Sequence, residues 1–210
     1  MKAAILGESD IDNQLVWRIV QGIRGTDISR VEHPSSVRSW PRLLYALPSV
    51  VKYLYYRTDA DALIVIADSD KTEVHERGHD GRNQNCRHCS LQLESDLVRA
   101  QLAPVEYRGD LRVIVVVPPP SIEAWFSLGD ANCGTEGAWR QALRNGAIAS
   151  LEIDRLKRLL YDEAALRSSQ RRLEHALQHA DRLLARIDHV EAAFPDSFGR
   201  FVDTVRSWPK

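Results

Sequence analysis

Acidic side chains follow three apolar runs of strand length in this sequence. Glu8 comes after the first run, Asp68 and Asp70 after the second, and Glu123 after the third. Mg²⁺ prefers oxygen ligands, and proteins usually hold it with one or two carboxylates while substrate phosphate and water complete its coordination. Several carboxylates in one place raise each other's pKa values, and a divalent cation relieves that repulsion. The pattern therefore predicts a Mg²⁺ site for chemistry on a phosphate-containing substrate.

The acids would have different roles at such a site. Asp68 and Asp70 form an Asp-x-Asp pair that can reach one ion from a strand end, so we expect both to be metal ligands. We expect Glu8 to be a metal ligand or a general base, and Glu123 to be an accessory acid. Asp12 is either a further catalytic acid or the N-cap of the helix that follows the first run.

A second group of chemically active residues lies in a polar stretch at about 71–90. It contains two histidines and a Cys-x-x-C pair, namely His75, His79, Cys86 and Cys89. Two imidazoles and two thiolates are a ligand set that Zn²⁺ binds tetrahedrally, and His88 could substitute for one of them. A structural zinc could fold this insertion, and nearby arginines would then present positive charge to phosphate: Arg77, Arg82 and Arg87. The alternative is a loop that binds no metal.

The elements that position these residues alternate along the chain. Apolar runs without polar alternation, such as Ala62–Ala67 and Leu111–Val117, are typical of strands covered on both faces. Helical spacing of apolar residues separates the runs, at 13–23, 42–56 and 91–102. The order predicts an α/β fold with a mostly parallel sheet flanked by helices. Ligands of such sheets bind beyond the carboxyl ends of the strands, so the acids would gather on one rim.

The remainder of the chain predicts a helical C-terminal region. We expect an α/β domain over 1–130 and helices over 131–210 packed on it. The segment Leu151–Ala193 is rich in helix-forming residues, and an amphipathic helix is favoured over a coiled coil.

The composition of the chain argues against several classes of protein. The chain has 210 residues, 44% of them hydrophobic, and a net charge of −1, so it lacks an overall basic field for nucleic acid. Its apolar runs are far shorter than a membrane span, and its start does not match a signal peptide. The three cysteines do not make a disulfide framework. We therefore expect a cytoplasmic protein without a membrane partner.

Three motifs in this order resemble the Toprim-like proteins. The Toprim pattern is a Glu after the first strand and an Asp-x-Asp after a later one, which correspond to Glu8, Asp68 and Asp70. The similarity is greatest to a small stand-alone branch of defence loci, the RloB-like group. That branch adds a Glu-Ala-Trp helix start, here at Glu123, and often a Ser-Phe pair, here at 197–198. One departure is that the first motif is Gly-Glu-Ser rather than Glu-Gly.

The resemblance implies a Toprim-like, Rossmann-like fold and a function. Toprim relatives cleave, rejoin or synthesise nucleic-acid backbones with Mg²⁺ or Mn²⁺. The chain would then be a metal-dependent nuclease acting on DNA or RNA, in a phage-defence system and with a partner ATPase.

Two other interpretations stay open. Residues 68–72 read Asp-Ser-Asp-Lys-Thr, which also fits the signature of haloacid-dehalogenase phosphatases, with Asp68 as nucleophile and Asp70 as acid/base. Ser121 and Lys157 would then bind phosphate and stabilise charge. The third interpretation is a non-catalytic, partner-binding subunit, supported by the segment 151–193 and by three tryptophans that we expect to be exposed: Trp17, Trp40 and Trp139.

Overall fold

The core of the protein is a four-stranded, all-parallel sheet. We analysed a computed structural model that describes residues 1–76, 78–79, 83, 85–128, 134–146 and 150–209. The sheet order is β2-β1-β3-β4, with strands β1 (Lys2–Gly7), β2 (Ser29–Arg30), β3 (Ala62–Ile66) and β4 (Arg112–Val116). The register aligns the last residues of β1, β3 and β4, which are Gly7, Ile66 and Val116. The predicted α/β fold class is therefore confirmed, and all three strands end at the same edge.

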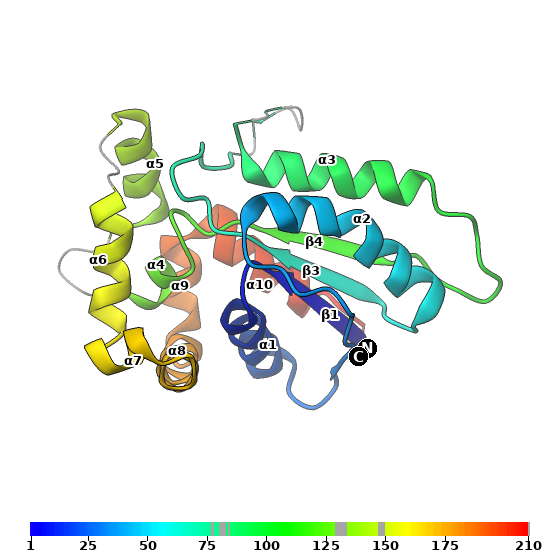
Figure 1. Cartoon of the computed structure of the whole chain (residues 1–210), viewed down its shortest axis with the longest axis horizontal. Coiled ribbons are helices and arrows are strands. Elements are labelled where there is room, and N and C mark those ends of the chain that lie inside the picture. Colours follow the sequence, from blue (N-terminus) through cyan, green and yellow to red (C-terminus); the bar gives the residue numbers. More distant parts are fainter. Residues whose placement is uncertain (77, 80–82, 84, 129–133, 147–149, 210) are drawn as a thin grey trace.

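Helices cover both faces of the sheet (Figure 1). One face packs against α2 (Trp40–Arg57) and α3 (Arg87–Ala100). The other packs against α1 (Asp10–Arg24) and against C-terminal helices. Successive residues of β1 and β3 alternate between these two cores, and every residue of β3 is buried, as its unbroken apolar run predicts.

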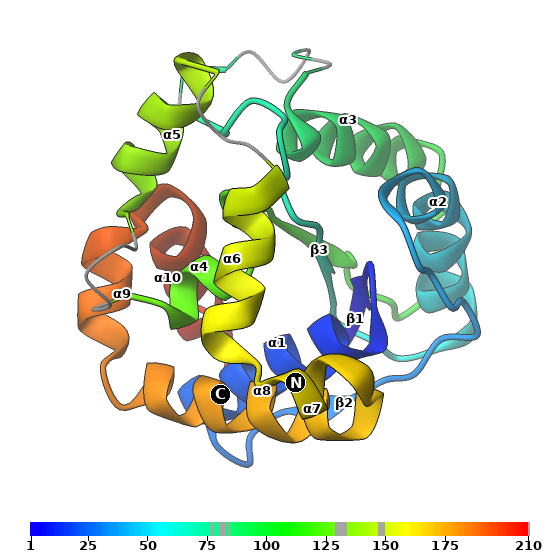
Figure 2. The same cartoon turned by 60° about the vertical axis from the view of Figure 1, so that its left-hand side comes forward.

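Helices make up most of the described chain after β4, and they lie beyond the carboxyl edge of the sheet and beside α1 (Figures 1 and 2). They are α4 (Glu123–Phe126), α5 (Glu136–Arg144), α6 (Ser150–Leu160), α7 (Glu163–Arg167), α8 (Ser169–Leu184), α9 (Ile187–Ala193), the π-helix η1 (Pro195–Gly199) and α10 (Arg200–Arg206). Their apolar side chains belong to the same core as those of α1. A region rich in helix-forming residues is confirmed, but a single long helix over 151–193 is wrong. Asp162 and Ser168 cap new helices within that segment and so divide it.

Two further expectations need correction. The strand β4 is not buried on all sides, because it lies at the edge of the sheet and three of its five residues are half-buried. The tryptophans are not exposed: Trp139 is only 7% exposed in the core, and Trp17 and Trp40 are half-buried. Their large apolar rings find cover among the helices, which removes one argument for a partner-binding surface. Within the ranges described, no helix combines the length and the apolar character needed to cross a membrane.

Candidate functional site

The first part of the site is the turn from β1 into α1. The helix begins three residues earlier than its apolar spacing suggests, and Ser9 is its N-cap. The hydroxyl of Ser9 accepts a hydrogen bond from the backbone nitrogen of Asp12 at 3.1 Å and donates one to Asp12 Oδ2 at 2.8 Å. Asp12 is therefore not the N-cap; it lies in the first turn, where a carboxylate is favoured by the helix dipole. Glu8 precedes the cap and is half-buried.

The second part joins the ends of β3 and β4. Asp68 accepts a hydrogen bond at Oδ1 from the backbone nitrogen of Ile122, at 3.0 Å. The backbone nitrogens of Ser69 and Asp70 donate to the carbonyl oxygens of Pro118 and Pro120. These bonds extend the pairing of the two strands past their ends. They bring Glu123, the first residue of α4, to the side chain of Asp68.

Three carboxylates from three elements interact here. Burial raises the pKa of Asp68 well above its usual range, and the charges of Glu123 and Asp12 raise it further. Burial also raises the pKa of Asp12 to about 7, and Glu123 and Glu8 add to this. Glu123 is only 7% exposed, and its Oε2 atom has no hydrogen-bond partner. A buried carboxylate oxygen without a partner is costly, and neighbouring negative charges add to that cost.

A second group of acids surrounds Arg87, the first residue of α3. Its guanidinium lies 2.7 Å from Asp70 Oδ2 and 3.3 Å from Glu8 Oε1, and it donates to the carbonyl oxygen of Asp68 at 2.6 Å. It also stacks on the ring of Trp40, at 4.9 Å from the centroid. Burial raises the pKa of Glu8, while the charge of Arg87 opposes this rise and that of Asp70 adds to it.

The structure thus divides the predicted acids into two adjoining sets. Asp12, Asp68 and Glu123 interact with one another, whereas Glu8 and Asp70 meet across Arg87. Among the described residues, these acids do not form a group of three or more side chains that could hold a metal ion.

Two residues from the C-terminal region contribute to the site, Lys157 and Tyr161, and sequence reasoning missed Tyr161. Lys157 of α6 faces the acids, and the charges of Glu123, Asp68, Asp12 and Asp70 raise its pKa although burial opposes this. Burial, with the charges of the same acids, also raises the pKa of Tyr161. A pocket of about 560 Å³ opens onto this region, between the loop after β3 and α6, lined by Asp70, Lys71, Thr72, Arg87, Ile153, Asp154 and Lys157. The sequence suggested Lys157 only for the phosphatase interpretation, because some ninety residues separate it from Asp68.

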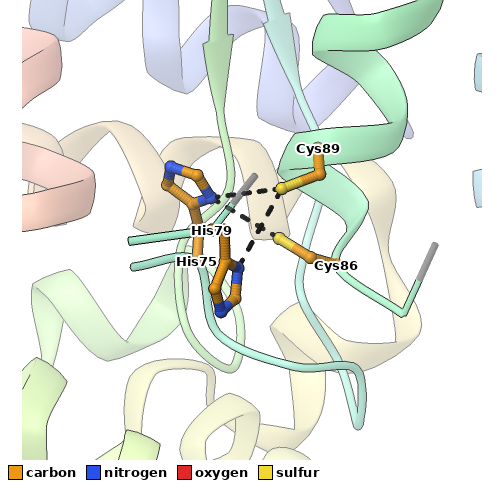
Figure 3. A group of neighbouring side chains, drawn as sticks. All are labelled: His75, His79, Cys86 and Cys89. Carbon is orange, nitrogen blue, oxygen red and sulfur yellow. Dashed lines mark hydrogen bonds between the residues drawn. The ribbon is translucent and has the colours of Figure 1, made fainter. Parts of the chain in front are cut away.

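The Cys/His group forms a compact cluster beside this rim (Figure 3). The ligand atoms of His75, His79, Cys86 and Cys89 all lie within 4.8 Å of one another, so these residues could bind a metal such as zinc. The helix α3 begins at Arg87, earlier than its apolar spacing predicts. Cys86 is consequently the N-cap of a helix and Cys89 lies in its first turn, rather than in a loop. Both thiols are buried.

The residues near the Cys/His cluster, His88 and the arginines, are only partly as the sequence predicts. His88 does not join the group; its ring stacks on that of His75 at 3.8 Å between centroids. Burial lowers the pKa of His88 to about 3, and that of His75 to about 4. Arg77, Arg82 and the third cysteine, Cys133, lie outside the described residues. Of the three arginines expected to face phosphate, only Arg87 can be placed, and it contacts acids.

The Glu-Ala-Trp and Ser-Phe motifs meet in the core. Trp125 Nε1 lies 3.4 Å from Ser197 Oγ, to which it donates, and its ring packs edge-on against Phe198 at 5.0 Å between centroids. Both rings are fully buried. The contact anchors α4, and with it Glu123, to the C-terminal region.

The sequence and structure of the chain were compared with known proteins, and no match was found. No family model matches the sequence, and neither a curated protein nor a solved structure matches the chain.

Proposed function

We propose that the acidic rim binds Mg²⁺ or Mn²⁺ and that the protein hydrolyses phosphodiester bonds of nucleic acid there. The observation that carries this proposal is the convergence of Asp12, Asp68 and Glu123. Burial raises the pKa of Asp12 and of Asp68, the charge of Glu123 raises both further, and one buried oxygen of Glu123 lacks a hydrogen-bond partner. Lys157 offsets part of this negative charge, and a bound cation would offset more of it.

The donor set fits a hard cation. All of these groups offer oxygen atoms, and Mg²⁺ prefers oxygen ligands and retains several water molecules. Asp68, Asp12 and Glu123 would hold the ion. When bound, it would neutralise charge on the phosphate and lower the pKa of a coordinated water.

The remaining side chains have tasks of their own. Burial raises the pKa of Glu8, which makes its carboxylate a stronger base for accepting a proton from attacking water than an ordinary glutamate. Lys157 and Arg87 line the pocket at the rim and would orient a phosphate. The choice of a nucleic-acid substrate, a phage-defence role and an ATPase partner rest on the resemblance to Toprim-like proteins.

Two observations, on Lys157 and on Ser121, favour a second candidate function, that of a phosphomonoesterase. Lys157 lies near enough to Asp68 for each to shift the pKa of the other, and the buried hydroxyl of Ser121 has no partner. These are the residues that the dehalogenase-type mechanism would use with Asp68 as nucleophile. That mechanism gives Glu8 no task.

One experiment separates the candidates. Wild-type protein, Glu8→Gln and Asp68→Asn are each incubated with DNA, RNA and a small aryl phosphate, with Mg²⁺ or Mn²⁺. The nuclease proposal expects cleavage of DNA or RNA that both variants lose. Hydrolysis of the aryl phosphate that Glu8→Gln retains and Asp68→Asn loses would support the phosphatase instead. Absence of hydrolysis with either metal would contradict both and favour a partner-binding subunit.

A further inference from the structure

Two buried thiols lie against two imidazoles at the start of α3. Cys86 and Cys89 are 0% and 1% exposed, and His75 and His79 are half-buried beside them. Free cysteine commonly lies in apolar cores, but here each thiol faces a ring nitrogen rather than only apolar groups. This setting is typical of a ligand cluster.

Two nitrogen–sulfur distances within the cluster match those of a tetrahedral zinc site, and a third is slightly longer. His75 Nδ1 lies 3.6 Å from the sulfur of Cys86 and 3.6 Å from that of Cys89, and His79 Nδ1 lies 4.0 Å from Cys89 (Figure 3). With Zn–S bonds of about 2.3 Å and Zn–N bonds of about 2.0–2.1 Å, tetrahedral angles place sulfur and nitrogen ligands roughly 3.6 Å apart. Two thiolates and two imidazoles also satisfy the preference of Zn²⁺ for soft and borderline ligands.

An outer partner supports the same assignment. While Nδ1 of His79 faces the sulfurs, its Nε2 lies 3.4 Å from Glu73 Oε1. The other carboxylate oxygen of Glu73 accepts a hydrogen bond from Asn83 Nδ2 at 2.7 Å. Metal-bound histidines usually donate their second ring N–H to a carboxylate in this way, which fixes the tautomer and the ring orientation.

We propose that His75, His79, Cys86 and Cys89 hold one Zn²⁺, and that this ion fixes the first turn of α3 and thereby Arg87. Four protein ligands leave no open position, so the ion would be structural. Helix α3 has no side-chain N-cap bond, because its N-cap residue is Cys86. Ligation of Cys86 and Cys89 would immobilise the turn that a cap normally secures.

Arg87 lies between the two cysteines in sequence and points to the acidic rim. Its contacts with Glu8, Asp68 and Asp70 require the first turn of α3 to stay in place. The loop has a second anchor, since Arg140 donates to the carbonyl oxygen of His75 at 3.3 Å and pairs with Asp196. Zinc loss would therefore loosen this turn rather than unfold the chain.

Zinc content tests the ligand set. The full chain, purified without chelator, is expected to contain about one zinc, and His79→Ala to lose most of it. His88→Ala is the matched control, because His88 stacks on His75 but lies outside the cluster. Absence of zinc from wild type that also fails to bind added Zn²⁺ or Co²⁺ would overturn the site. So would loss of zinc from His88→Ala with retention in His79→Ala.

A milder variant tests the site without removing a ligand. Glu73→Gln keeps the fold of the loop but weakens the contact with His79, so zinc affinity measured against a competing chelator should fall roughly 10- to 100-fold. Unchanged affinity would contradict the proposed geometry.

A separate measurement tests whether zinc holds the side chain of Arg87 in place. The Nε–Hε signal of Arg87 in NMR spectra should be resolved in the zinc-loaded protein and should move toward those of mobile arginines when a chelator removes zinc. An unchanged signal would overturn the link. None of the three measurements involves hydrolysis, so they test the zinc site independently of the proposed function; only the catalytic use of Arg87 depends on that function.

Discussion

The side chain of Asp68 accepts a hydrogen bond at Oδ1 from the backbone nitrogen of Ile122, 3.0 Å away. This bond crosses from the end of β3 to the residue before α4. It fixes where α4 begins, and so places Glu123 beside Asp68. One oxygen of the Asp68 carboxylate thus connects the ends of β3 and β4 at this rim.

Replacing Asp68 by Asn separates this structural role from a role in binding a cation. The amide oxygen can still accept from Ile122, so the fold should persist, while the charge that attracts a cation is lost. We expect metal-dependent hydrolysis to fall by about 10²- to 10³-fold, because several kcal/mol of transition-state stabilisation depend on such an ion. Rates at saturating Mg²⁺ or Mn²⁺ would measure this.

Asp110→Asn is the matched control. Asp110 is an exposed acid that precedes β4, at the opposite edge of the sheet from the rim. Its loss should leave the rate unchanged. Equal rates for wild type and Asp68→Asn would exclude the rim as the catalytic centre.

The contribution of Asp12 to the stability of the metal-free protein should fall as pH rises through the range of about 4 to 7. The pKa of Asp12 is raised from 3.8 to about 7 in the folded state, so its carboxyl group holds a proton in the folded chain that it has lost in the unfolded chain. Raised pKa values of Asp68 and Glu8 act in the same direction. Half-buried His75 and His88, whose pKa values are lowered to about 4 and 3, act in the opposite direction, so the prediction concerns the difference between wild type and a variant at Asp12.

Asp12→Asn should flatten this dependence. Above pH 7 we expect it to raise the free energy of unfolding of the metal-free protein by on the order of 2 kcal/mol. Denaturant unfolding at pH 5 and pH 8 checks this. Added Mg²⁺ should stabilise wild type more at pH 8 than at pH 5, because it binds ionised carboxylates. The same pH dependence in wild type and in Asp12→Asn would contradict the raised pKa of Asp12.

Removing the charge of Arg87 should affect metal binding and catalysis in opposite directions. In Arg87→Met, Glu8 and Asp70 lose their cationic partner, so a divalent ion would meet less repulsion. A unit charge and a divalent ion repel by about 1 kcal/mol in water-like surroundings, so Mn²⁺ should bind roughly fivefold more tightly. Hydrolysis should fall, since the phosphate loses a positively charged group.

Titration with Mn²⁺ followed by electron paramagnetic resonance measures the affinity. Arg99→Met is a suitable control, because Arg99 lies near the other end of α3. Weaker Mn²⁺ binding in Arg87→Met would show that Arg87 supports the cation indirectly, and would refute this electrostatic account.

Gly7→Ala should destabilise the turn that presents Glu8. A Cβ atom at Gly7 would lie 2.7 Å from Asn13 Oδ1 and 3.0 Å from Ile66 Cγ2. Such overpacking typically costs about 1–3 kcal/mol. Gly109→Ala is the control, since a Cβ there would meet no atom within 4 Å and should change stability by less than about 0.5 kcal/mol. Thermal unfolding of both variants tests the difference; equal stabilities would mean that Asn13 moves aside freely.

The sequence by itself determined the main elements and the edge at which the acids gather. Unbroken apolar runs indicated β1, β3 and β4, and helical spacing indicated α1, α2 and α3, because the periods of buried strands and amphipathic helices differ. The parallel order of strands then placed Glu8, Asp68 and Glu123 beyond one edge. The residues of the Cys/His cluster were also evident from their types, since two cysteines and two histidines in a polar stretch suggest a metal.

Only the tertiary structure decided which of these groups meet. Lys157 lies in helix α6 and Tyr161 directly follows that helix, and both interact with the acids. No local sequence pattern predicts that α6 packs beside this edge of the sheet. Arg87 was expected to face phosphate, yet it joins Glu8 to Asp70, and Asp12 rather than Asp70 accompanies Asp68. The physical reason is that hydrophobic spacing fixes which face of an element is buried, whereas charge pairing depends on the angles and connections by which elements pack.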